Sequence, residues 1–426
     1  MFRLSSTQKN MGLLPCPLPC HTIKESQSES LSNHLSSTSS LSSQPSLPSV
    51  PSLSLPFQAP TTIYHHCLAT LEGHSYVSSL ALSGKLLFSG SSNSDIRAWS
   101  RDPFVLHQPQ APTDNVVATG NGAAVKSLVV LGDKLFSAHQ DHKIRVWKID
   151  HDSADKRYEC VATLPTLNDR FTRCFSAKNY VEVRRHRKCT WVHHVDTVSA
   201  LAISKDGSLL YSASWDRAFK IWRTSDFKCL ESVNKAHDDA INAIEVSNVG
   251  FVYTGSADKK IKVWKKQLEE KKHSLMGTLE KHKSAVNALA LSSTDGSVLY
   301  SGACDRSILV WERDDNVTGA DDSGHMALTG ALRGHTKAIL CLAVVSNLVF
   351  SGSADNTVRI WRRGVEKSSY SCLAVLKGHG RPVKCLTADV GSDNTDANSD
   401  SGTSFLVYSG SLDCDIKIWQ IRVPFL

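Results

Sequence analysis

The sequence lacks any apolar run long enough to cross a membrane as a helix, so we expect no membrane span. The apolar stretch at residues 11–20 is broken by prolines, and we expect no secretory signal there. The 12 cysteines show none of the spacings of a disulfide framework, which favours a reducing compartment. We therefore expect the protein in the cytoplasm and nucleus.

Sites for metals and phosphates are also missing. No glycine-rich phosphate loop occurs, and Cys16 with Cys20 offers at most half of a zinc site. The aspartates of residues 314–322 and 393–400 lack the spacing of a calcium loop. We expect neither a metal nor another cofactor.

Little net positive charge lies outside one segment. The formal net charge is +7, but residues 167–190 hold seven basic side chains against two acidic ones, which leaves only +2 for the rest of the chain. One short basic run without an aromatic series is a small footprint for a nucleic acid. We do not expect direct nucleic-acid binding.

What the sequence does contain is one unit repeated seven times. Each copy ends in a short alternating strand that closes on a tryptophan: Trp99, Trp147, Trp222, Trp264, Trp311, Trp361 and Trp419. Six residues earlier stands an acidic or amide side chain: Asn93, Asp141, Asp216, Asp258, Asp305, Asp355 and Asp413. Four residues before that stands a hydroxyl: Ser89, Ser137, Ser212, Thr254, Ser301, Ser351 and Ser409. Such a repeat of four short strands predicts an all-β fold, a single seven-bladed β-propeller.

The repeat also divides the chain. Residues 1–62 are rich in Ser and Pro and poor in charge, so we expect a disordered head in which Leu53 belongs to an apolar spot of a linker. Residues 63–426 form the propeller, with an insertion at 167–190 between blades 2 and 3. Residues 63–71 form a spare strand, and we expect it to close the ring as the outer strand of blade 7.

A histidine heads six of the seven copies, whereas Asn121 stands at this place in the second. These histidines are His74, His194, His237, His282, His335 and His379. His, Ser and Asp together could suggest a hydrolase triad, but a triad is needed once and this set recurs. We interpret it as a buried structural network in which the Asp accepts from the His, the His contacts the hydroxyl, and the hydroxyl meets the indole N–H. We expect no catalytic residue.

These repeats resemble the WD-repeat family over residues 63–421. A narrower resemblance rests on Asn179-Tyr-Val-Glu-Val-Arg-Arg-His186, Ser214-Trp-Asp-Arg217 and Ala236-His-Asp-Asp-Ala-Ile-Asn-Ala243, which are similar to the plant Jingubang-type proteins. That resemblance implies a non-enzymatic scaffold that restrains pollen germination and tube growth through protein partners, transcription factors among them. The wider WD-repeat resemblance implies a partner-binding face at one mouth of the channel.

On that face Trp215 is the unusual residue, because the residue before the turn Asp is small in most copies. Trp and Arg are favoured binding anchors, so Trp215 with Arg217 is a candidate contact; packing of Trp215 on the neighbouring insertion is the alternative. Further candidates follow from their offset to the His position: Tyr76, Lys126, Asn242, Asn287, Leu340 and Lys384. The basic run before the third copy, which we expect on the same face, adds Arg184, Arg185, Arg187 and Lys188. A solvated charge run is the alternative for these four.

A substrate receptor of a cullin-type ubiquitin ligase is the alternative function. Such receptors show Trp-Asp-x-Arg after the third strand, and only Trp311-Glu-Arg-Asp comes near it in this chain. The head also lacks the helical pattern of an F-box.

Overall fold

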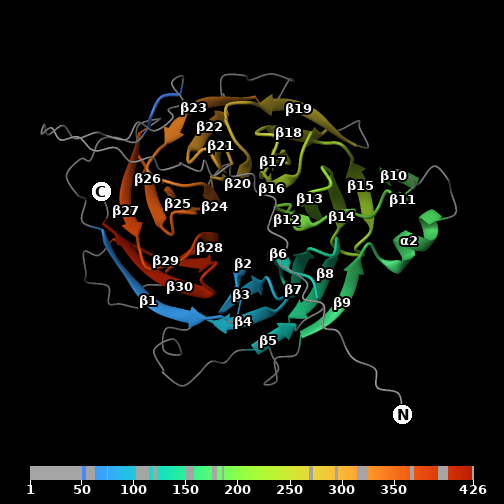
Figure 1. The fold of residues 1–426 in the computed structure, drawn as a ribbon, viewed down its shortest axis with the longest axis horizontal. Coiled ribbons are helices and arrows are strands. Elements are labelled where there is room, and N and C mark those ends of the chain that lie inside the picture. The colour runs from blue at the N-terminus through green and yellow to red at the C-terminus, as the bar shows by residue number, and fades with distance from the viewer. Residues whose placement is uncertain are drawn as a thin grey trace, which may run out of the picture. The chain divides into compact units, whose positions relative to one another are not determined.

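The computed structural model describes residues 50–53, 63–73, 75–101, 115–118, 122–149, 158–174, 180–184, 187–267, 272–292, 296–313, 325–364, 369–391 and 402–424. The chain divides into the units Met1–Leu47 and Pro48–Leu426, and all described residues fall in the second. That unit is a ring of seven four-stranded antiparallel sheets (Figure 1), which confirms the predicted seven-bladed β-propeller.

Each blade carries its first strand at the channel and its fourth strand at the rim. Blade 1 consists of β2 (Val77–Ser83), β3 (Leu86–Ser91), β4 (Ile96–Ser100) and β5 (Asn115–Ala118). Blade 2 consists of β6 (Val125–Leu131), β7 (Lys134–His139), β8 (Ile144–Ile149) and β9 (Tyr158–Leu164). Blade 3 consists of β12 (Val198–Ile203), β13 (Leu209–Ser214), β14 (Phe219–Arg223) and β15 (Cys229–Val233).

The remaining blades follow the same order. Blade 4 consists of β16 (Ile241–Val246), β17 (Val252–Ser256), β18 (Ile261–Lys266) and β19 (His273–Leu279). Blade 5 consists of β20 (Val286–Leu291), β21 (Val298–Ala303), β22 (Ile308–Arg313) and β23 (Met326–Leu332). Blade 6 consists of β24 (Ile339–Val345), β25 (Leu348–Ser353), β26 (Val358–Arg363) and β27 (Tyr370–Leu376).

Blade 7 is built from both ends of the ring. Its strands are β28 (Val383–Val390), β29 (Thr403–Ser411), β30 (Asp415–Val423) and β1 (Tyr64–Glu72), and β1 pairs antiparallel with β30 from Tyr64↔Arg422 to Glu72↔Asp415. The strand that precedes the first repeat therefore closes the ring, as the sequence predicted. Arg101 of blade 1 strengthens this joint, since its guanidinium donates to the Tyr408 hydroxyl at 3.0 Å and to Asp389 at 2.8 Å.

The core lies between neighbouring blades. Alternating apolar residues of one sheet face those of the next, as when Phe219 of blade 3 and Trp264 of blade 4 meet with ring centroids 5.3 Å apart. Tight turns keep the strands short. Gly207, in the turn between β12 and β13, has a φ of +71°, a left-handed value that favours glycine, and its N–H donates to Ser204 O at 2.8 Å.

The expectation for the head needs one correction. Residues 50–53 pack against blade 5: Leu53 N donates to Ala331 O and Ala331 N donates to Pro51 O, each at 3.0 Å, and Val50 and Leu53 are buried. The free edge of β23 supplies these backbone groups, and an apolar cleft takes up Leu53. Apart from these four residues, the predicted head of residues 1–62 lies outside the described part of the chain.

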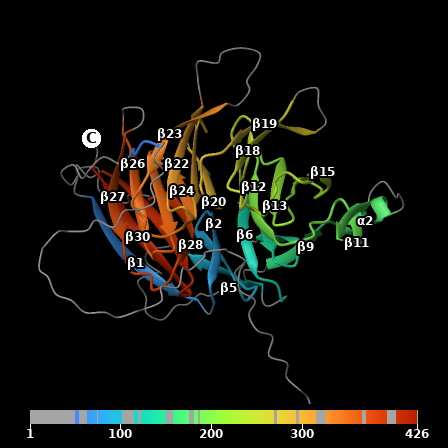
Figure 2. The ribbon, with the colours of Figure 1, turned by 45° about the horizontal axis from the view of Figure 1, so that its top comes forward.

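The insertion between blades 2 and 3 also departs from expectation. It contains the helix α2 (Leu167–Cys174) and the hairpin of β10 (Tyr180–Arg184) and β11 (Arg187–Thr190). Asp169 holds the helix to the rim of blade 3, because its carboxylate accepts from Cys229 N at 2.9 Å. Figures 1 and 2 both place α2 and the hairpin outside β15, on the outer side of the ring. The hairpin that carries the basic run thus lies at the outer rim and not beside the channel, and its place on the channel-mouth face stays a prediction.

Candidate functional site: the channel-mouth face

In blades 3 to 7 the His, hydroxyl, Asp and Trp of each repeat form one chain of hydrogen bonds. Each indole N–H donates to the hydroxyl at 2.8–2.9 Å, and each hydroxyl lies 2.8 Å from the His Nε2. Each His Nδ1 lies 2.8–2.9 Å from an Asp Oδ2. The sets are His194–Ser212–Asp216–Trp222, His237–Thr254–Asp258–Trp264, His282–Ser301–Asp305–Trp311, His335–Ser351–Asp355–Trp361 and His379–Ser409–Asp413–Trp419.

The electrostatics of these chains are those of a structural element. Burial opposes ionisation of Asp216, but the hydrogen bond and charge of His194 outweigh it and lower the pKa of Asp216 to about 2. Burial in turn lowers the pKa of His194. Asp216 is thus an ionised acceptor for the Nδ1–H of His194. The five hydroxyl residues are 0% exposed, so no substrate could reach them as nucleophiles.

In blade 2 a histidine from another position of the repeat completes the hydrogen-bond chain. Asn121 lies outside the described residues, but His139 at the end of β7 places its Nε2 2.8 Å from Ser137 Oγ, which also accepts from the Trp147 indole N–H. Burial and then the charge of Arg145 lower the pKa of His139 to about 4. Asp141 pairs instead with Arg145, at 2.7 Å. A signal for this was present in the sequence, since blade 2 loses a His at 121 and gains one at 139.

Trp215 stands in the turn between β13 and β14 and is half-buried. Lys126, the second residue of the inner strand β6, places its Nζ 5.5 Å from the centroid of the Trp215 ring, which is a cation–π distance. The backbone N–H of Trp215 donates to Thr197 O at 3.0 Å, which fixes the turn against the residue that precedes β12. The structure therefore brings together two predicted site residues from different blades.

Two side chains extend this group. Arg217, in the same turn, is exposed and has a φ of +68°. Val195 is 36% exposed, and its N–H donates at 3.0 Å to the carboxylate of Asp216 in this turn. Sequence reasoning missed Val195, because a single apolar residue after the His carries no distinguishing signal.

Asn242 and Asn287 serve the ring itself. Their amide groups donate to backbone oxygens of the next blade: Asn242 to Val286 O at 3.0 Å and Asn287 to Ile339 O at 2.8 Å. Ser78 has the same place in blade 1 and donates to Val125 O. The offset from the His position had predicted Tyr76 for this place, but Ser78 occupies it. The side chain of Tyr76 is 43% exposed. We leave the two asparagines out of the candidate site.

The other predicted contacts are dispersed. Lys384 is exposed on β28 of blade 7, and Leu340 is half-buried on β24 of blade 6. Arg184, Arg187 and Lys188 belong to the outer hairpin, and Arg185 lies outside the described residues.

Neither a membrane helix nor a metal site is found in the described part of the chain. None of its helices is long and apolar enough to cross a membrane. No three of its His, Cys, Asp or Glu residues are grouped so that they could hold a metal ion.

Comparison with known proteins agrees with this geometry. The model of the WD domain, G-beta repeat family matches residues 65–100, 186–223, 227–265, 273–312, 326–362 and 370–420, and these ranges pass over blade 2, where the network is altered. The WD40 β-propeller domain of Doa1 superposes with a TM-score of 0.58 over 83% of this chain and 96% of that one, at 19% identity, which shows the fold alone.

Curated relatives are similar over part of their length. Autophagy-related protein 16 of Arabidopsis thaliana is 28% identical over 206 residues, which cover 46% of this chain and 36% of that protein. Kinesin-like protein KIF21B of Mus musculus is 23% identical over 367 residues, which cover 83% of this chain and 19% of that protein. The chain thus spans about a fifth to about a third of the length of these two relatives. Propellers of this type generally serve as scaffolds for protein interactions, and the family match covers more than half of the sequence. The chain belongs to the WD domain, G-beta repeat (WD40) family.

Proposed function

We propose that this protein is a non-enzymatic regulatory adaptor that binds a protein segment at the channel mouth of blades 2 and 3. The observation that carries the proposal is the Trp215 ring held over Lys126, beside the exposed Arg217. An aromatic ring kept at a turn by a neighbouring blade is pre-ordered, so little side-chain entropy is lost when a partner covers it. Trp and Arg are also the residue types most enriched at binding hot spots.

The charges define the partner's chemistry. Lys126 of blade 2 and Lys384 of blade 7 flank the inner strand of blade 1, and Arg217 lies in blade 3. Lys126 and Lys384 stand at the strand position where blades 4 and 5 carry the neutral Asn242 and Asn287, whereas Arg217 has basic counterparts in those blades, Lys259 and Arg306. An acidic segment with an apolar or aromatic residue for Trp215 and Val195 fits this arrangement.

The finer assignment rests on the resemblance to the Jingubang-type proteins. We propose that the protein is a plant regulator that restrains pollen germination and tube growth, with a transcription factor among its partners. We propose residence in the cytoplasm and nucleus, with the basic segment 184–188 as the import signal. A fluorescent fusion tests this: serine substitutions in the segment should shift the signal to the cytoplasm, and unchanged nuclear signal would contradict the assignment.

The binding site is tested with the full-length chain as bait. Proteins captured by the wild type are compared with those captured by Trp215→Ala, and affinity is then measured for each one that differs. Loss of a central aromatic anchor should weaken binding by about thirtyfold, or roughly 2 kcal/mol. Val249→Ala is the matched control. Val249 is an apolar residue, 51% exposed, in the turn between β16 and β17 on the face of the ring opposite to Trp215.

The outcomes separate the functions. Equal affinity of the wild type and Trp215→Ala for every captured protein would refute the site. A cullin adaptor as the main wild-type partner would favour the ubiquitin-ligase alternative. In the plant, loss of the protein should raise pollen germination, and the Trp215→Ala variant should fail to restore the restraint.

A further inference from the structure

Residues 50–53 show how the rim of this propeller takes up an extended peptide. The segment pairs in parallel with the free edge of β23 through the Ser52↔Ala331 bridge and its two backbone hydrogen bonds. Pro51 offers its carbonyl oxygen to Ala331 N and has no N–H to extend the ladder, so the parallel pairing ends there. Arg333 completes the contact by donating to Val50 O at 2.8 Å.

The side chain of Leu53 fills the cleft between the rims of blades 5 and 6. It shares a buried cluster with Trp361 and Tyr370 of blade 6. The absence of a side chain at Gly330 makes the room, since a Cβ there would lie 2.5 Å from Leu53 Cγ. Blades 2, 6 and 7 carry an alanine at the same register, and blade 3 carries Glu231.

The cleft between blades 4 and 5 repeats this arrangement residue by residue. Gly277 pairs with Val263 as Gly330 pairs with Val310, so Gly277 and Thr278 correspond to Gly330 and Ala331. On the facing blade, Trp311 corresponds to Trp361. Met326, which pairs with Arg313, corresponds to Tyr370, which pairs with Arg363.

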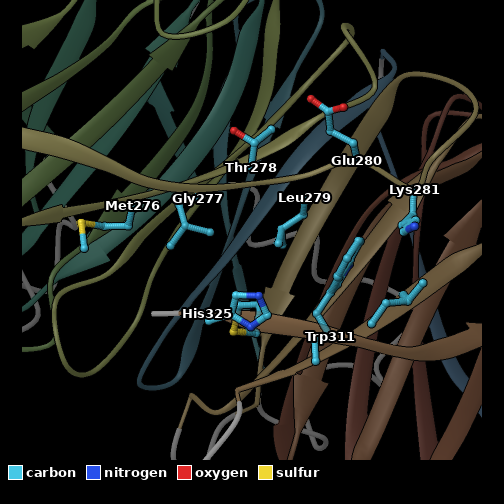
Figure 3. Close-up of a pocket in the computed structure, with 12 residues that line it drawn as sticks. Met276, Gly277, Thr278, Leu279, Glu280, Lys281, Trp311 and His325 are labelled. Atoms are coloured by element: carbon cyan, nitrogen blue, oxygen red, sulfur yellow. The ribbon is translucent and has the colours of Figure 1, made fainter. Parts of the chain in front are cut away.

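No described residue fills this second cleft. It is a cavity of about 320 Å³ that is lined by Gly277, Thr278, Trp311 and Met326 among others. A Cβ on Gly277 would meet nothing within 4 Å. Figure 3 shows the segment from Met276 to Lys281 on one side of the cavity and Trp311 with His325 on the other. The space that Leu53 occupies beside blade 5 is thus open beside blade 4.

We propose that the cleft between blades 4 and 5 is a second interaction site, which binds an extended Pro-x-Leu segment of a partner protein. The segment adds as a parallel strand to the free edge of β19, with its backbone on Thr278 and its leucine over Gly277 against Trp311 and Met326. Strand addition draws affinity from the main chain and specificity from alternate side chains. The site is separate from the channel mouth.

Charge distinguishes the two clefts and therefore the two ligands. The place of Arg333, which binds the oxygen of Val50, is taken in blade 4 by Glu280. The carboxylate of Glu280 is 58% exposed, beside Lys260 at 3.1 Å. The partner segment accordingly carries a basic residue where the head carries Val50, and an acidic residue there is disfavoured.

The test measures binding of two fluorescent peptides, Ser-Lys-Pro-Ser-Leu-Ser and Ser-Glu-Pro-Ser-Leu-Ser, to the full-length chain by anisotropy. The lysine peptide should bind saturably and at least about fivefold more tightly than the glutamate peptide. Gly277→Ala should weaken the lysine peptide at least about tenfold, because the new Cβ takes the space of the leucine. Gly330→Ala, which disturbs only the cleft that Leu53 fills, is the matched control and should leave this affinity unchanged. Glu280→Lys should reverse the preference between the peptides.

Thermal melting of each variant verifies folding, and Gly277→Ala should match the wild type because its Cβ faces open space. Absence of saturable binding would overturn the proposal, as would equal binding to Gly277→Ala. Loss of binding in Gly330→Ala alone would mean that the peptide displaces residues 50–53, which also overturns it. The head also holds Pro45-Ser46-Leu47, a second Pro-x-Leu sequence outside the described residues, so a triple substitution to serine at Leu47, Val50 and Leu53 gives the last arm. Binding that appears only in this variant would assign the cleft to the chain's own head and not to a partner.

Discussion

Replacing Asp305 with alanine removes the carboxylate at one end of the hydrogen-bond chain of blade 5. Its Oδ2 accepts from His282 Nδ1 at 2.9 Å and from Lys283 N at 3.0 Å, and its Oδ1 accepts from Ser307 N at 3.1 Å. Asp305→Ala therefore leaves the buried His282 ring without its acceptor and loosens the turn. The indole of Trp311 is affected through the shared hydroxyl of Ser301.

Two arguments give the size of the effect. An unsatisfied buried donor costs about 1–3 kcal/mol. Burial works against the charge of Asp305, yet His282 and Ser307 lower its pKa from 3.8 to about 2, which corresponds to roughly 2 kcal/mol of stability. Because the folded pKa is depressed, this contribution is present above pH 4 and is lost as the pH falls toward 2. We expect Asp305→Ala to lower the free energy of unfolding by about 2–3 kcal/mol at pH 7.

The matched control is Asp141→Ala, at the same position of blade 2. Asp141 pairs with Arg145, and its side chain is 27% exposed, whereas His139 closes the buried chain without it. Asp141 is partly exposed and serves only Arg145, so we expect Asp141→Ala to cost less than Asp305→Ala. Urea denaturation followed by tryptophan fluorescence measures both variants at pH 7 and again at pH 3, where the difference between them should narrow by about 1 kcal/mol because part of the Asp305 contribution is lost. If Asp141→Ala proved as costly as Asp305→Ala, blade 2 would depend on its Asp like the other blades. His139 would then not replace the usual His–Asp pair.

Three further predictions use the same assay. His139→Gln should reduce the loss of stability that the wild type shows as the pH falls from 6.5 to 4. In this range the unfolded chain binds a proton that the buried His139, with its pKa of about 4, does not bind, and this difference corresponds to about 3 kcal/mol. An unchanged pH profile would contradict this prediction. Asn93→Ala should cost less than Asp305→Ala, because the amide of Asn93 is exposed and bonds its neighbours Ser91 and Asp95; a larger cost would show that blade 1 depends on it. Deleting residues 1–47 should leave the free energy of unfolding unchanged, and deleting 1–60 should lower it by about 1–3 kcal/mol through the loss of Val50 and Leu53. Deleting 1–72 should lower it most because it removes β1, and equal values for the last two deletions would contradict the role of β1.

The sequence by itself determined the architecture. Each Trp, Asp and hydroxyl recurs at fixed offsets because each blade must satisfy the same buried groups, so local spacing encodes the seven blades and their registers. The closing strand could be predicted too, since Tyr64–Glu72 has no blade of its own and pairs with β30 of blade 7.

The candidate site could be predicted only in part. Trp215 stood out because its size broke the pattern of its position, but its contact with Lys126 joins two blades and has no trace in sequence spacing. The roles of Asn242 and Asn287 were likewise hidden, because their partners are backbone oxygens of the next blade.

Tertiary structure alone decided what happens at the rim. The hairpin with Arg184 and Arg187 lies outside β15 because Asp169 ties α2 to the edge of blade 3, an interaction between residues 60 positions apart. The segment at Leu53 reads as linker, yet it fills the space that Gly330 leaves beside a free strand edge. Offsets within one repeat fix the contacts made inside a blade, whereas contacts across blades depend on how the closed ring brings their surfaces together.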